Sequence, residues 1–527
     1  MNEAMRPASS SHSVDVLILG GSLSGASLGL LLKRENPEWT VTIVEKSAAF
    51  KRRVGESTSE VGGCFLTRVL RLSRHLSQEH IVKHGLRLWF QKDGNECVSH
   101  CGEIGPFFQA RLPTYQLDRA TLDQHVLETA EVEGCEVVRP ARSLEISLEG
   151  EGKNRVMVKT AAGEERVYRS KWVIDATGKA AVIGRQRDTL KPLTDHATKS
   201  LWARFRGVKD LDGSELAMKH PEFAASCSVS RSSATNHLLG RGWWCWLIPL
   251  KNGDVSAGVT YDPRYFQLER RGNLSETLLA HLREHPIGKW MFEDAEVVPK
   301  DTLTYTQLAY ENLEVAGDGW ASVGDAAGFM DPLYSHGIDF IGHTVMTVKG
   351  FVSRSLRGED TRKDWQRYKH GYGESYRRWF EALYQNKYAY LGDADLMRAA
   401  FLLDIGAYFI GPVDFVYRNT ELEFARMPYH GPIGGLIAKL MRFYNRRLVT
   451  LADLRQSVGL YGVHNLDNRY LLKPGFSPGG AALKPFAKGL WAWWKCELQG
   501  VQHRFLPRQT GVDSPPATGA EQLSSTL

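Results

Sequence analysis

The chain has 527 residues, of which 43% are hydrophobic and 24% are charged, a composition typical of a globular protein with two or three structural units. The formal net charge is only +6 and no basic stripe is visible, so the sequence does not favour a nucleic-acid partner. The seven cysteines form no CxxC pair, which indicates reduced thiols in a cytoplasmic protein, and no second ligand cluster accompanies Cys97, His100 and Cys101, so no metal site is expected.

The N-terminal segment 1–13 is polar and has no apolar run, so we expect a disordered start without a secretory signal. Val14–Gly20 then reads as a strand buried on both faces, and a helical pattern follows through Lys33. Val41–Glu45 is a second buried strand. This order of strand, glycine turn, helix and strand predicts a β-α-β unit that binds a dinucleotide.

The turn of this unit is Gly20-Gly21-Ser22-Leu23-Ser24-Gly25. Small residues let the backbone approach a pyrophosphate, which the N-terminus of the following helix can bind. Ser22 stands where a central glycine is usual, and its hydroxyl can still bond phosphate. Glu45 ends the second strand, where a carboxylate can accept hydrogen bonds from ribose hydroxyls and disfavours a 2′-phosphate.

Two distant segments repeat the pattern of a buried strand that runs into small residues, Trp172–Gly178 and Ala321–Gly328. With Arg119 near the start of a helix, they resemble the glutathione-reductase-type FAD fold of flavoprotein monooxygenases. An open alternative for Arg119 is a surface position. The resemblance implies FAD, held by Gly20, Ser22, Leu23, Ser24, Gly25, Glu45, Lys46, Arg52, Gly55, Glu56, Ser57, Thr58, Arg119, Gly178, Gly324, Asp325, Pro332, Gly337 and Ile338.

The predicted fold is therefore α/β, with a glutathione-reductase-type, Rossmann-like FAD-binding module over 14–350. Alternating patterns and turn signals predict a mixed β-sheet substrate domain inserted at about 190–310. Residues 351–509 read as a helical C-terminal region. The Ser/Thr/Pro/Gly-rich tail 510–527 is expected to be disordered.

A more specific motif follows in the middle of the chain, Trp244-Cys245-Trp246-Leu247-Ile248-Pro249. On a strand, Trp244, Trp246 and Ile248 face the same side and form an apolar wall. The segment is similar to the WxWxIP motif of flavin-dependent halogenases, of which the tryptophan halogenases are the best-known branch. The resemblance implies that the wall keeps organic substrate away from the flavin. Core packing of aromatic residues is the alternative.

A lysine provides the second resemblance to this family. Gly55-Glu56-Ser57-Thr58 resembles the GESxxP motif, with Glu60 in place of the proline, and Lys83 follows at the family's spacing. On a strand, Lys83 would share a face with Gly85 and Arg87. An amine in an apolar tunnel loses its proton readily and could carry hypohalous acid to one substrate carbon, which makes Lys83 the candidate catalytic residue. A solvated surface lysine is the alternative.

The third resemblance is the segment Gly328–Ile338, similar to the family's GFxDPLxSxG. It implies a flavin contact beside a halide site at Ser335, His336 and Gly337, where backbone N–H groups could form an anion nest. His336 replaces a small residue, and it could favour halide when protonated or fill the site. Tyr334 replaces the glutamate of tryptophan-type members, which makes tryptophan a poorer substrate guess.

The resemblance implies an enzyme that uses reduced FAD, O2 and chloride or bromide to halogenate a phenol, pyrrole or indole in natural-product biosynthesis. No second glycine-rich unit for NAD(P)H is evident, so a separate NAD(P)H-dependent flavin reductase is expected as a partner. The substrate could be free or carried by an acyl carrier protein. An FAD monooxygenase on the same scaffold and a flavin-binding protein without turnover are the alternatives.

The C-terminal region offers one further pattern. Apolar residues at helical spacing lie among basic ones, Leu436, Ile437, Leu440, Met441 and Tyr444 with Lys439, Arg442, Arg446 and Arg447, and Trp491, Trp493 and Trp494 with Lys488 and Lys495. Such a surface could receive an acidic carrier protein or touch a membrane. An amphipathic helix that covers the core is the alternative. The apolar stretch Ala399–Tyr417 is interrupted by Asp404 and Pro412, so it predicts a core helix without a transmembrane segment.

Overall fold

The structure is a computed structural model that describes residues 10–92, 94–107, 109–467, 469–472 and 477–508. The disorder expected for 1–9 and 510–527 lies outside the described residues. Residues 10–13 are not disordered. They belong to the first strand and pair in parallel with Arg166–Arg169. The long partner strand extends beyond the apolar run that begins at Val14, so the strand begins before this run.

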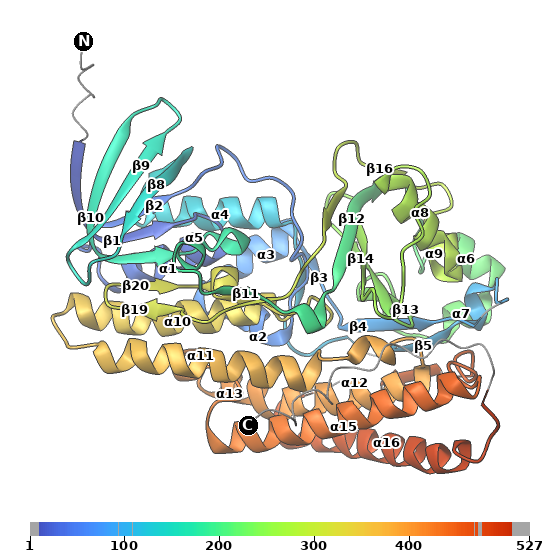
Figure 1. The fold of residues 1–527 in the computed structure, drawn as a ribbon. Helices are drawn as coiled ribbons and strands as arrows, with labels where there is room; N and C mark the ends of the chain where they lie inside the picture. The colour runs from blue at the N-terminus through green and yellow to red at the C-terminus, as the bar shows by residue number, and fades with distance from the viewer. Residues whose placement is uncertain (1–9, 93, 108, 468, 473–476, 509–527) are drawn as a thin grey trace, which may run out of the picture.

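The first sheet is the expected dinucleotide-type sheet, seen on the left of Figure 1. Its main path in spatial order is β19 (Ala316–Gly317), β20 (Trp320–Ser322), β10 (Glu165–Asp175), β1 (Ser10–Leu19), β2 (Val41–Val44) and β7 (Glu136–Val138). The central strands run parallel, with Val16 of β1 between Trp172 and Val41. The antiparallel strands β8 (Ala141–Ser147) and β9 (Asn154–Thr160) extend the sheet beside β10. Both faces of β1 are buried, which explains its continuous apolar run.

The second sheet lies on the right of Figure 1. Its order is β16 (Glu296–Val297), β12 (Lys199–Arg206), β15 (Val255–Tyr261), β14 (Trp243–Pro249), β13 (Thr235–Gly240), β4 (Leu86–Phe90), β5 (Gly102–Pro106) and β22 (Arg469–Leu472), with β17 (Leu303–Tyr305) also on β12. The expected boundary of about 190–310 is therefore too narrow, and the helical region 351–509 contributes one strand, β22. The pairing of β13 with β4 joins residues 149 apart and that of β22 with β5 joins residues 366 apart, and short strands carry no local signal of their partners.

Two small sheets complete the strands, β11 (Leu190–Pro192) with β18 (Tyr310–Asn312) and β21 (Gly328–Phe329), and β3 (Ile81–Val82) with β6 (Tyr115–Gln116). The helices of the first two thirds are α1 (Leu23–Glu35), α2 (Glu60–Cys64), α3 (Ser73–Glu79), α4 (Arg119–Val132), α5 (Val182–Gln186), α6 (Ser214–Lys219), α7 (Pro221–Ala225), α8 (Leu274–Glu284) and α9 (Pro286–Met291). The helices of the last third are α10 (Gly337–Leu356), α11 (Arg362–Leu383), α12 (Ala394–Tyr408), α13 (Asp414–Arg418), α14 (Thr420–Phe424), α15 (Gly431–Ser457) and α16 (Leu483–His503). Short 3-10 or π turns are η1 (Phe65–Val69), η2 (Val98–His100), η3 (Gly178–Ala180), η4 (Thr194–His196), η5 (Gly324–Ala326), η6 (Lys387–Ala389), η7 (Phe409–Val413) and η8 (Gly479–Ala482).

The C-terminal helices lie along the lower side of the molecule, below both sheets (Figure 1). In the described residues, one helical segment, Ala394–Arg418, is apolar and long enough to cross a bilayer, but 72% of its most apolar window is buried inside the protein. The charge that interrupts this segment is also buried. Asp404 accepts hydrogen bonds from Tyr334, Tyr444 and Lys387, so the carboxylate is part of the core.

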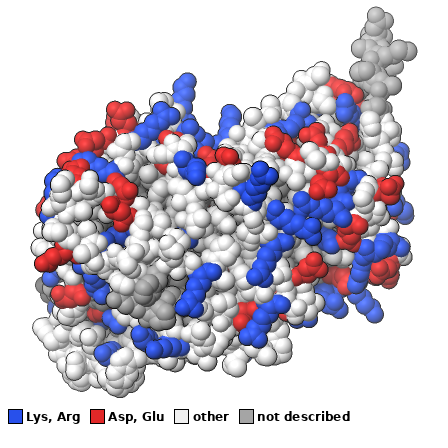
Figure 2. Space-filling view, turned by 180° about the vertical axis from the view of Figure 1, so that it is seen from behind, with Lys and Arg blue, Asp and Glu red and all other residues white. Residues whose placement is uncertain are grey.

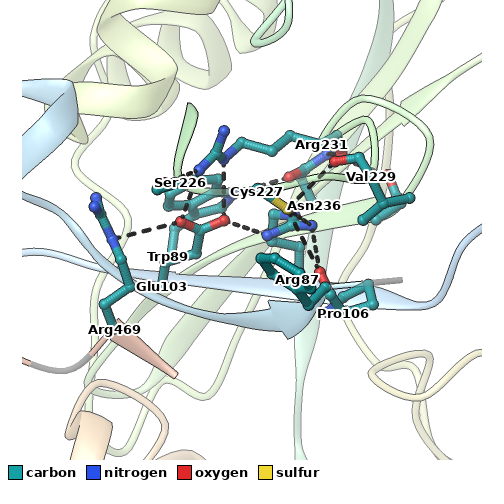
Figure 3. Close-up of polar contacts among 12 residues, drawn as sticks. Arg87, Trp89, Glu103, Pro106, Ser226, Cys227, Val229, Arg231, Asn236 and Arg469 are labelled. Carbon is teal, nitrogen blue, oxygen red and sulfur yellow. Dashed lines mark hydrogen bonds and ion pairs between the residues drawn. The ribbon is translucent and has the colours of Figure 1, made fainter. Parts of the chain in front are cut away.

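A buried ionic network holds the edge of the second sheet, as Figure 3 shows. Glu103 of β5 binds Arg87 of β4 and Arg231, with the Nε atom of Arg231 3.0 Å from its Oε1 atom. All three side chains are at most 1% exposed. Removing Glu103 would leave two buried guanidinium groups without their carboxylate, so the network fixes the position of β4 relative to β5.

Candidate functional site

Two cavities lie between the sheets and the C-terminal helices. The larger cavity has a volume of about 390 Å³, within the range of cofactor sites, and is lined by Ser22, Ser24, Arg119, Asp325, the β14 indoles and His336, among others. The smaller cavity has a volume of about 100 Å³ and is lined by Lys83, Glu60, Tyr334, His336 and residues of α12 and η7. His336 lines both cavities, so it lies in the wall between them.

The glycine turn of the first β-α-β unit is built for close approach. Gly20 has a φ of +103°, and a Cβ atom there would lie 2.4 Å from the carbonyl oxygen of Ala176. A Cβ atom on Gly25 would lie 1.9 Å from the carbonyl oxygen of Gly20, so Gly25 permits the packing of α1 on the strand. Ser22 caps α1 without a side-chain capping hydrogen bond, and it lines the larger cavity. The N-terminal end of α1 therefore presents a hydroxyl and a positive dipole to this cavity.

Charged side chains lie at the same end of the larger cavity. Arg119 binds Asp123 through two guanidinium nitrogens and is only 8% exposed, so it is not a surface arginine. Arg53 lines the cavity, and its guanidinium lies 3.1 Å from Asp123. Burial raises the pKa of Asp325 above its usual range, and the positive charges of Arg119 and Arg53 oppose this shift. The cavity thus combines a carboxyl group with two arginines.

The structure places twelve of the predicted cofactor residues on the larger cavity, namely Ser22, Ser24, Lys46, Gly55, Glu56, Ser57, Arg119, Gly178, Asp325, Pro332, Gly337 and Ile338. The others do not line it, namely Gly20, Leu23, Gly25, Glu45, Arg52, Thr58 and Gly324. The Glu45 carboxylate instead accepts hydrogen bonds from the backbone of Gly21 and Ser47, both at 2.8 Å. Arg52 pairs with Asp254 at 3.7 Å. The cavity position belongs to Arg53, which the sequence cannot distinguish from its neighbour.

The indole wall of β14 lies on the larger cavity. Trp244, Trp246 and Ile248 all line it, while the intervening Cys245 and Leu247 face the other side of the sheet and pack in its core. The two indole rings are 5.7 Å apart at their centroids. The Nε1 atom of Trp244 donates to the Tyr388 hydroxyl at 2.9 Å, which fixes its ring. The alternation of a strand thus produces the predicted wall.

A buried polar network that no sequence pattern predicts lies behind this wall. Asp331 accepts hydrogen bonds from Tyr388 at 2.8 Å and from the Leu333 backbone at 2.9 Å, and its Oδ2 atom lies 3.0 Å from Nε2 of His196. Tyr388 links this carboxylate to Trp244. The network therefore connects the segment before α10 to the indole wall. Only Asp331 lies in a recognisable motif, and its partners are 135 and 57 residues away, so no local pattern reveals them.

Lys83 is buried, with 3% exposure, and is not a solvated lysine. Its Nζ atom donates to the Ser57 hydroxyl and to the Thr58 carbonyl oxygen, both at 2.7 Å. The expected strand is interrupted between β3 and β4, where Gly85 has a φ of +82°. Lys83 therefore does not share a strand face with Arg87, because the chain turns at Gly85 and Arg87 points into the Glu103 network. This break directs the amine into the smaller cavity.

The electrostatics around Lys83 favour an amine that changes its charge near neutral pH. Burial lowers the pKa of Lys83 to about 8, while the negative charges of Glu60 and Asp339 oppose the shift. Burial also raises the pKa of Glu60, and raises that of Asp339 to about 7. Asp339 accepts hydrogen bonds from Ser59 and from the backbone N–H of Gly62. Glu60, the residue that replaces the expected proline, thus lies in the same cavity as Lys83.

The segment Ser335–Gly337 forms the junction of the two cavities. Ser335 adopts a φ of +61°, and its N–H donates to the carbonyl oxygen of Pro332 at 3.0 Å. This N–H is therefore not available for an anion, and the nest is reduced to the first amides of α10. Burial lowers the pKa of His336 to about 3, so the side chain is neutral at physiological pH. Its Nδ1 atom lies 2.9 Å from the Tyr384 hydroxyl. A protonated His336 that attracts halide is therefore disfavoured.

The larger cavity fits an FAD molecule. The close-approach turn and α1 N-terminus suit a pyrophosphate, and Asp325 at a strand end suits hydroxyl groups. The aromatic side of β14 suits a flat ring. Among the described residues, no group of three or more His, Cys, Asp or Glu side chains is arranged to hold a metal ion.

Comparisons with known proteins agree with this architecture. The family model described as tryptophan halogenase matches residues 107–387. The flavin-dependent halogenase chlA of Dictyostelium discoideum is 24% identical over 361 residues, which cover 62% of this chain and 58% of that protein. The monodechloroaminopyrrolnitrin halogenase PrnC of Pseudomonas fluorescens is 25% identical over 383 residues, covering 66% of this chain and 63% of that protein. The matched part thus spans less than two thirds of these relatives.

The solved structures agree over more of the chain. The crystal structure of the halogenase PltM has a TM-score of 0.72 at 17% sequence identity, and the match covers 92% of this chain and 98% of that one. The structure of the chondrochloren halogenase CndH, a myxobacterial protein, has a TM-score of 0.60 at 17% identity and covers 82% of this chain. At these identities the likeness shows the fold, which is the predicted FAD-binding fold with a second sheet and a helical C-terminal region.

Proposed function

The chain belongs to the tryptophan halogenase family, and from this premise we propose that it is an FAD-dependent halogenase that acts on a small electron-rich aromatic compound. The observation that carries the proposal is the pair of cavities divided by a wall, with indoles on one side and a buried amine on the other. A hydroxylase requires its organic substrate to reach the flavin. A halogenase requires that its organic substrate is kept away from the flavin.

In this proposal the larger cavity holds FAD, with Ser22 and the α1 amides at the pyrophosphate and Arg53, Arg119 and Asp325 around its polar part. When bound in its reduced form with O2 and halide, FAD supplies the oxidation of halide to hypohalous acid. The protein contributes an enclosed space, which limits the loss of this reactive species to water. Trp244 and Trp246 occupy the side of the cavity where an aromatic guest would otherwise stack.

Lys83 is the proposed catalytic residue in the smaller cavity. Its neutral amine can take the halogen from hypohalous acid with release of water, and its ammonium form can donate a hydrogen bond to the same species. Either form would hold the electrophile at one place. The hydrogen bonds to Ser57 and Thr58 fix the amine, so one ring carbon of a bound substrate would be closest to it.

The smaller cavity sets the class of substrate. Leu86, Phe401, Ile405, Tyr408 and Phe409 provide an apolar and aromatic part of its lining. Polar and charged residues, among them Glu60, Lys83, Gln109, Arg111 and Asp404, line the rest. One water needs about 10–15 Å³ by this measure, so a volume of about 100 Å³ suits a single substituted ring. We infer a phenol-, pyrrole- or indole-type ring, free or attached to a carrier protein, because these rings react with electrophilic halogen.

The remaining parts of the proposal concern partners and location. A separate NAD(P)H-dependent reductase would deliver reduced FAD, since no second glycine-rich β-α-β unit for NAD(P)H is evident in the sequence. We place the reaction in the cytoplasm, supported by seven cysteines that are all free thiols.

The test is the mass of the product formed by the purified chain from a panel of phenols, pyrroles and indoles, with chemically reduced FAD and O2, in the presence and absence of bromide. We expect a bromine isotope doublet that requires bromide. A product that gains one oxygen irrespective of bromide would instead assign a monooxygenase. Flavin that binds without any modified product in the panel would contradict both.

A further inference from the structure

The last two long helices present an apolar surface that the catalytic proposal does not use. On α15 the exposed residues Ile433, Leu436, Leu440 and Phe443 recur at a spacing of three or four and form one stripe. The opposite side of the same helix, including Ala438, Met441 and Leu448, is buried against the protein. The helix therefore already covers the core with one face, and the second apolar face needs another explanation.

The second stripe lies on α16. Its exposed apolar residues are Leu483, Leu490, Trp491, Trp494, Leu498 and Val501. Gly489, Cys496 and Gly500 form its buried side. Trp491 and Trp494 are 56% and 49% exposed, and their rings stack with centroids 4.8 Å apart. Two tryptophans in solvent on one helix face are unusual for a surface without a partner.

The two stripes border each other. The ring of Phe443 on α15 contacts Trp493 of α16 at 5.9 Å, and Arg447 binds Glu497 across the same helix pair. Gly500 of α16 approaches Leu451 of α15 so closely that a Cβ atom would lie 2.4 Å from it. We call the combined exposed residues of α15 and α16 the apolar platform. It lies on the lower side of the molecule in Figure 1, where α15 and α16 are drawn.

The charges around the apolar platform are mostly positive, although Glu381 of α11 pairs with Arg442 of α15. Helix α15, Gly431–Ser457, contains five Lys or Arg residues and one acid, Asp453, and Leu483–Gly500 contains three lysines and one acid, Glu497. Arg447 neutralises that acid. Among the described residues, no acidic side chain pairs with the exposed Lys439, Arg446, Lys484 and Lys488. Figure 2 shows the lower edge of the molecule largely white, with scattered blue and little red.

We propose that the apolar platform docks the protein on the surface of an anionic lipid bilayer. Tryptophan and leucine side chains insert at the boundary of headgroups and acyl chains, while long lysine and arginine side chains contact the headgroup phosphates. A predominantly cationic rim matches the negative surface of an anionic bilayer.

The apolar platform lies close to the smaller cavity. Phe486 of α16 packs on Gly406 of α12, and α12 supplies Phe401, Asp404 and Ile405 to the smaller cavity. The platform and the cavity are therefore separated by one layer of helix. An enzyme seated in this way would take up aromatic compounds that partition into the membrane. This extension rests on the proposed function, while the docking itself does not.

The test is co-sedimentation of the full-length protein with vesicles of phosphatidylcholine alone and with vesicles that contain about a third phosphatidylglycerol. We expect binding to the anionic vesicles and at least ten-fold less binding to the neutral ones, with loss of binding at high salt because exposed charges are screened. Trp491→Ser with Trp494→Ser should reduce the bound fraction by at least ten-fold, and Lys439→Glu with Lys488→Glu should do the same.

Met218→Ser is the matched control, because Met218 is an exposed apolar residue on α6, outside the platform. This variant should bind as the unmodified protein does. Far-UV circular dichroism and FAD binding verify that each variant is folded. No sedimentation with anionic vesicles would overturn the proposal, as would equal loss in the Met218→Ser variant. A dimer in light scattering that the tryptophan changes dissociate, without vesicle binding, would assign the platform to a second copy of the chain. Loss of halogenation with vesicle binding intact would affect only the proposed function.

Discussion

The Nζ atom of Lys83 lies 2.7 Å from the Oγ atom of Ser57, and this hydrogen bond crosses from one cavity to the other. Ser57 lines the larger cavity, where the indole wall lies, while Lys83 lines the smaller one. Ser57 is in turn 3.0 Å from the Thr235 hydroxyl, so its position is fixed by the second sheet. The amine is thus placed at the boundary where a small oxidant formed on one side would be received on the other.

The first prediction concerns the pH dependence of halogen transfer. Burial lowers the pKa of Lys83 to about 8, so the neutral fraction of the amine rises from about a tenth at pH 7 to about nine tenths at pH 9. If the neutral amine carries the halogen, single-turnover halogenation accelerates about ten-fold over this range. The measurement is quenched-flow product formation with preformed reduced FAD. A rate that is flat or falls from pH 7 to 9 would leave the hydrogen-bonding form as the active one.

The second prediction uses the neighbour of Lys83. The negative charge of Glu60 favours the ammonium form and opposes the effect of burial. In Glu60→Gln the negative charge that favours the ammonium form is lost, so the pKa of Lys83 falls further. The midpoint of the rise in halogenation rate with pH therefore moves to lower pH. The shift should be on the order of one pH unit, because a single charge in a buried site changes a pKa by about that amount. An unchanged midpoint would show that Glu60 does not influence the amine. Glu128→Gln on exposed α4 surface is the control.

The third prediction tests the indole wall. Trp246→Leu should open the larger cavity to organic guests, and the yield of halogenated product per reduced FAD consumed should fall by about ten-fold or more. An oxygenated product should appear in the mass spectrum. Trp243→Leu removes an indole of similar burial from the other face of the same strand, so it controls for lost packing. If both variants lose coupling equally, the wall is only a part of the core.

The fourth prediction concerns halide binding. Burial keeps the pKa of His336 at about 3, so its imidazole stays neutral throughout the range from pH 5.5 to 7. The halide concentration for half-maximal rate should therefore change by less than about two-fold over this range. A requirement for halide that falls by about ten-fold per unit as the pH is lowered would contradict this account, because it would show a histidine that gains a proton to attract the anion.

Some of the site could be predicted from the sequence because its signals are local. The turn from Gly20 to Gly25 and the alternation of Trp244 and Trp246 are patterns within a few residues. Ser22 and Ser24 of the turn and both indoles line the larger cavity, whereas the other predicted turn residues do not. The identity of the cavity arginine could not be predicted, since Arg52 and Arg53 are neighbours and only the tertiary turn decides which one faces inward. The hydrogen bond between Asp331 and Tyr388 could not be predicted either, because the two residues are 57 positions apart and only the tertiary fold brings them together.

The fold shows the same division. The first sheet follows from buried apolar runs, whereas the place of β4, β5 and β22 in the second sheet depends on pairings between distant segments. Lys83 illustrates both cases. Its burial agrees with what the resemblance implies. The direction of its side chain, however, depends on the break in the strand at Gly85, and no hydrophobic periodicity in the sequence indicates that break.

The most direct test of the account is the Lys83→Ala variant, assayed for flavin oxidation and brominated product in the same reaction. We expect the oxidation of reduced FAD to continue within about two-fold of the unmodified rate, because the amine lies outside the larger cavity, and the brominated product to fall by about 10²–10⁴-fold. Lys92→Ala, a change outside both cavities, should alter neither quantity. Retention of the brominated product in Lys83→Ala, or loss of flavin oxidation together with the product, would contradict the separation of the two compartments.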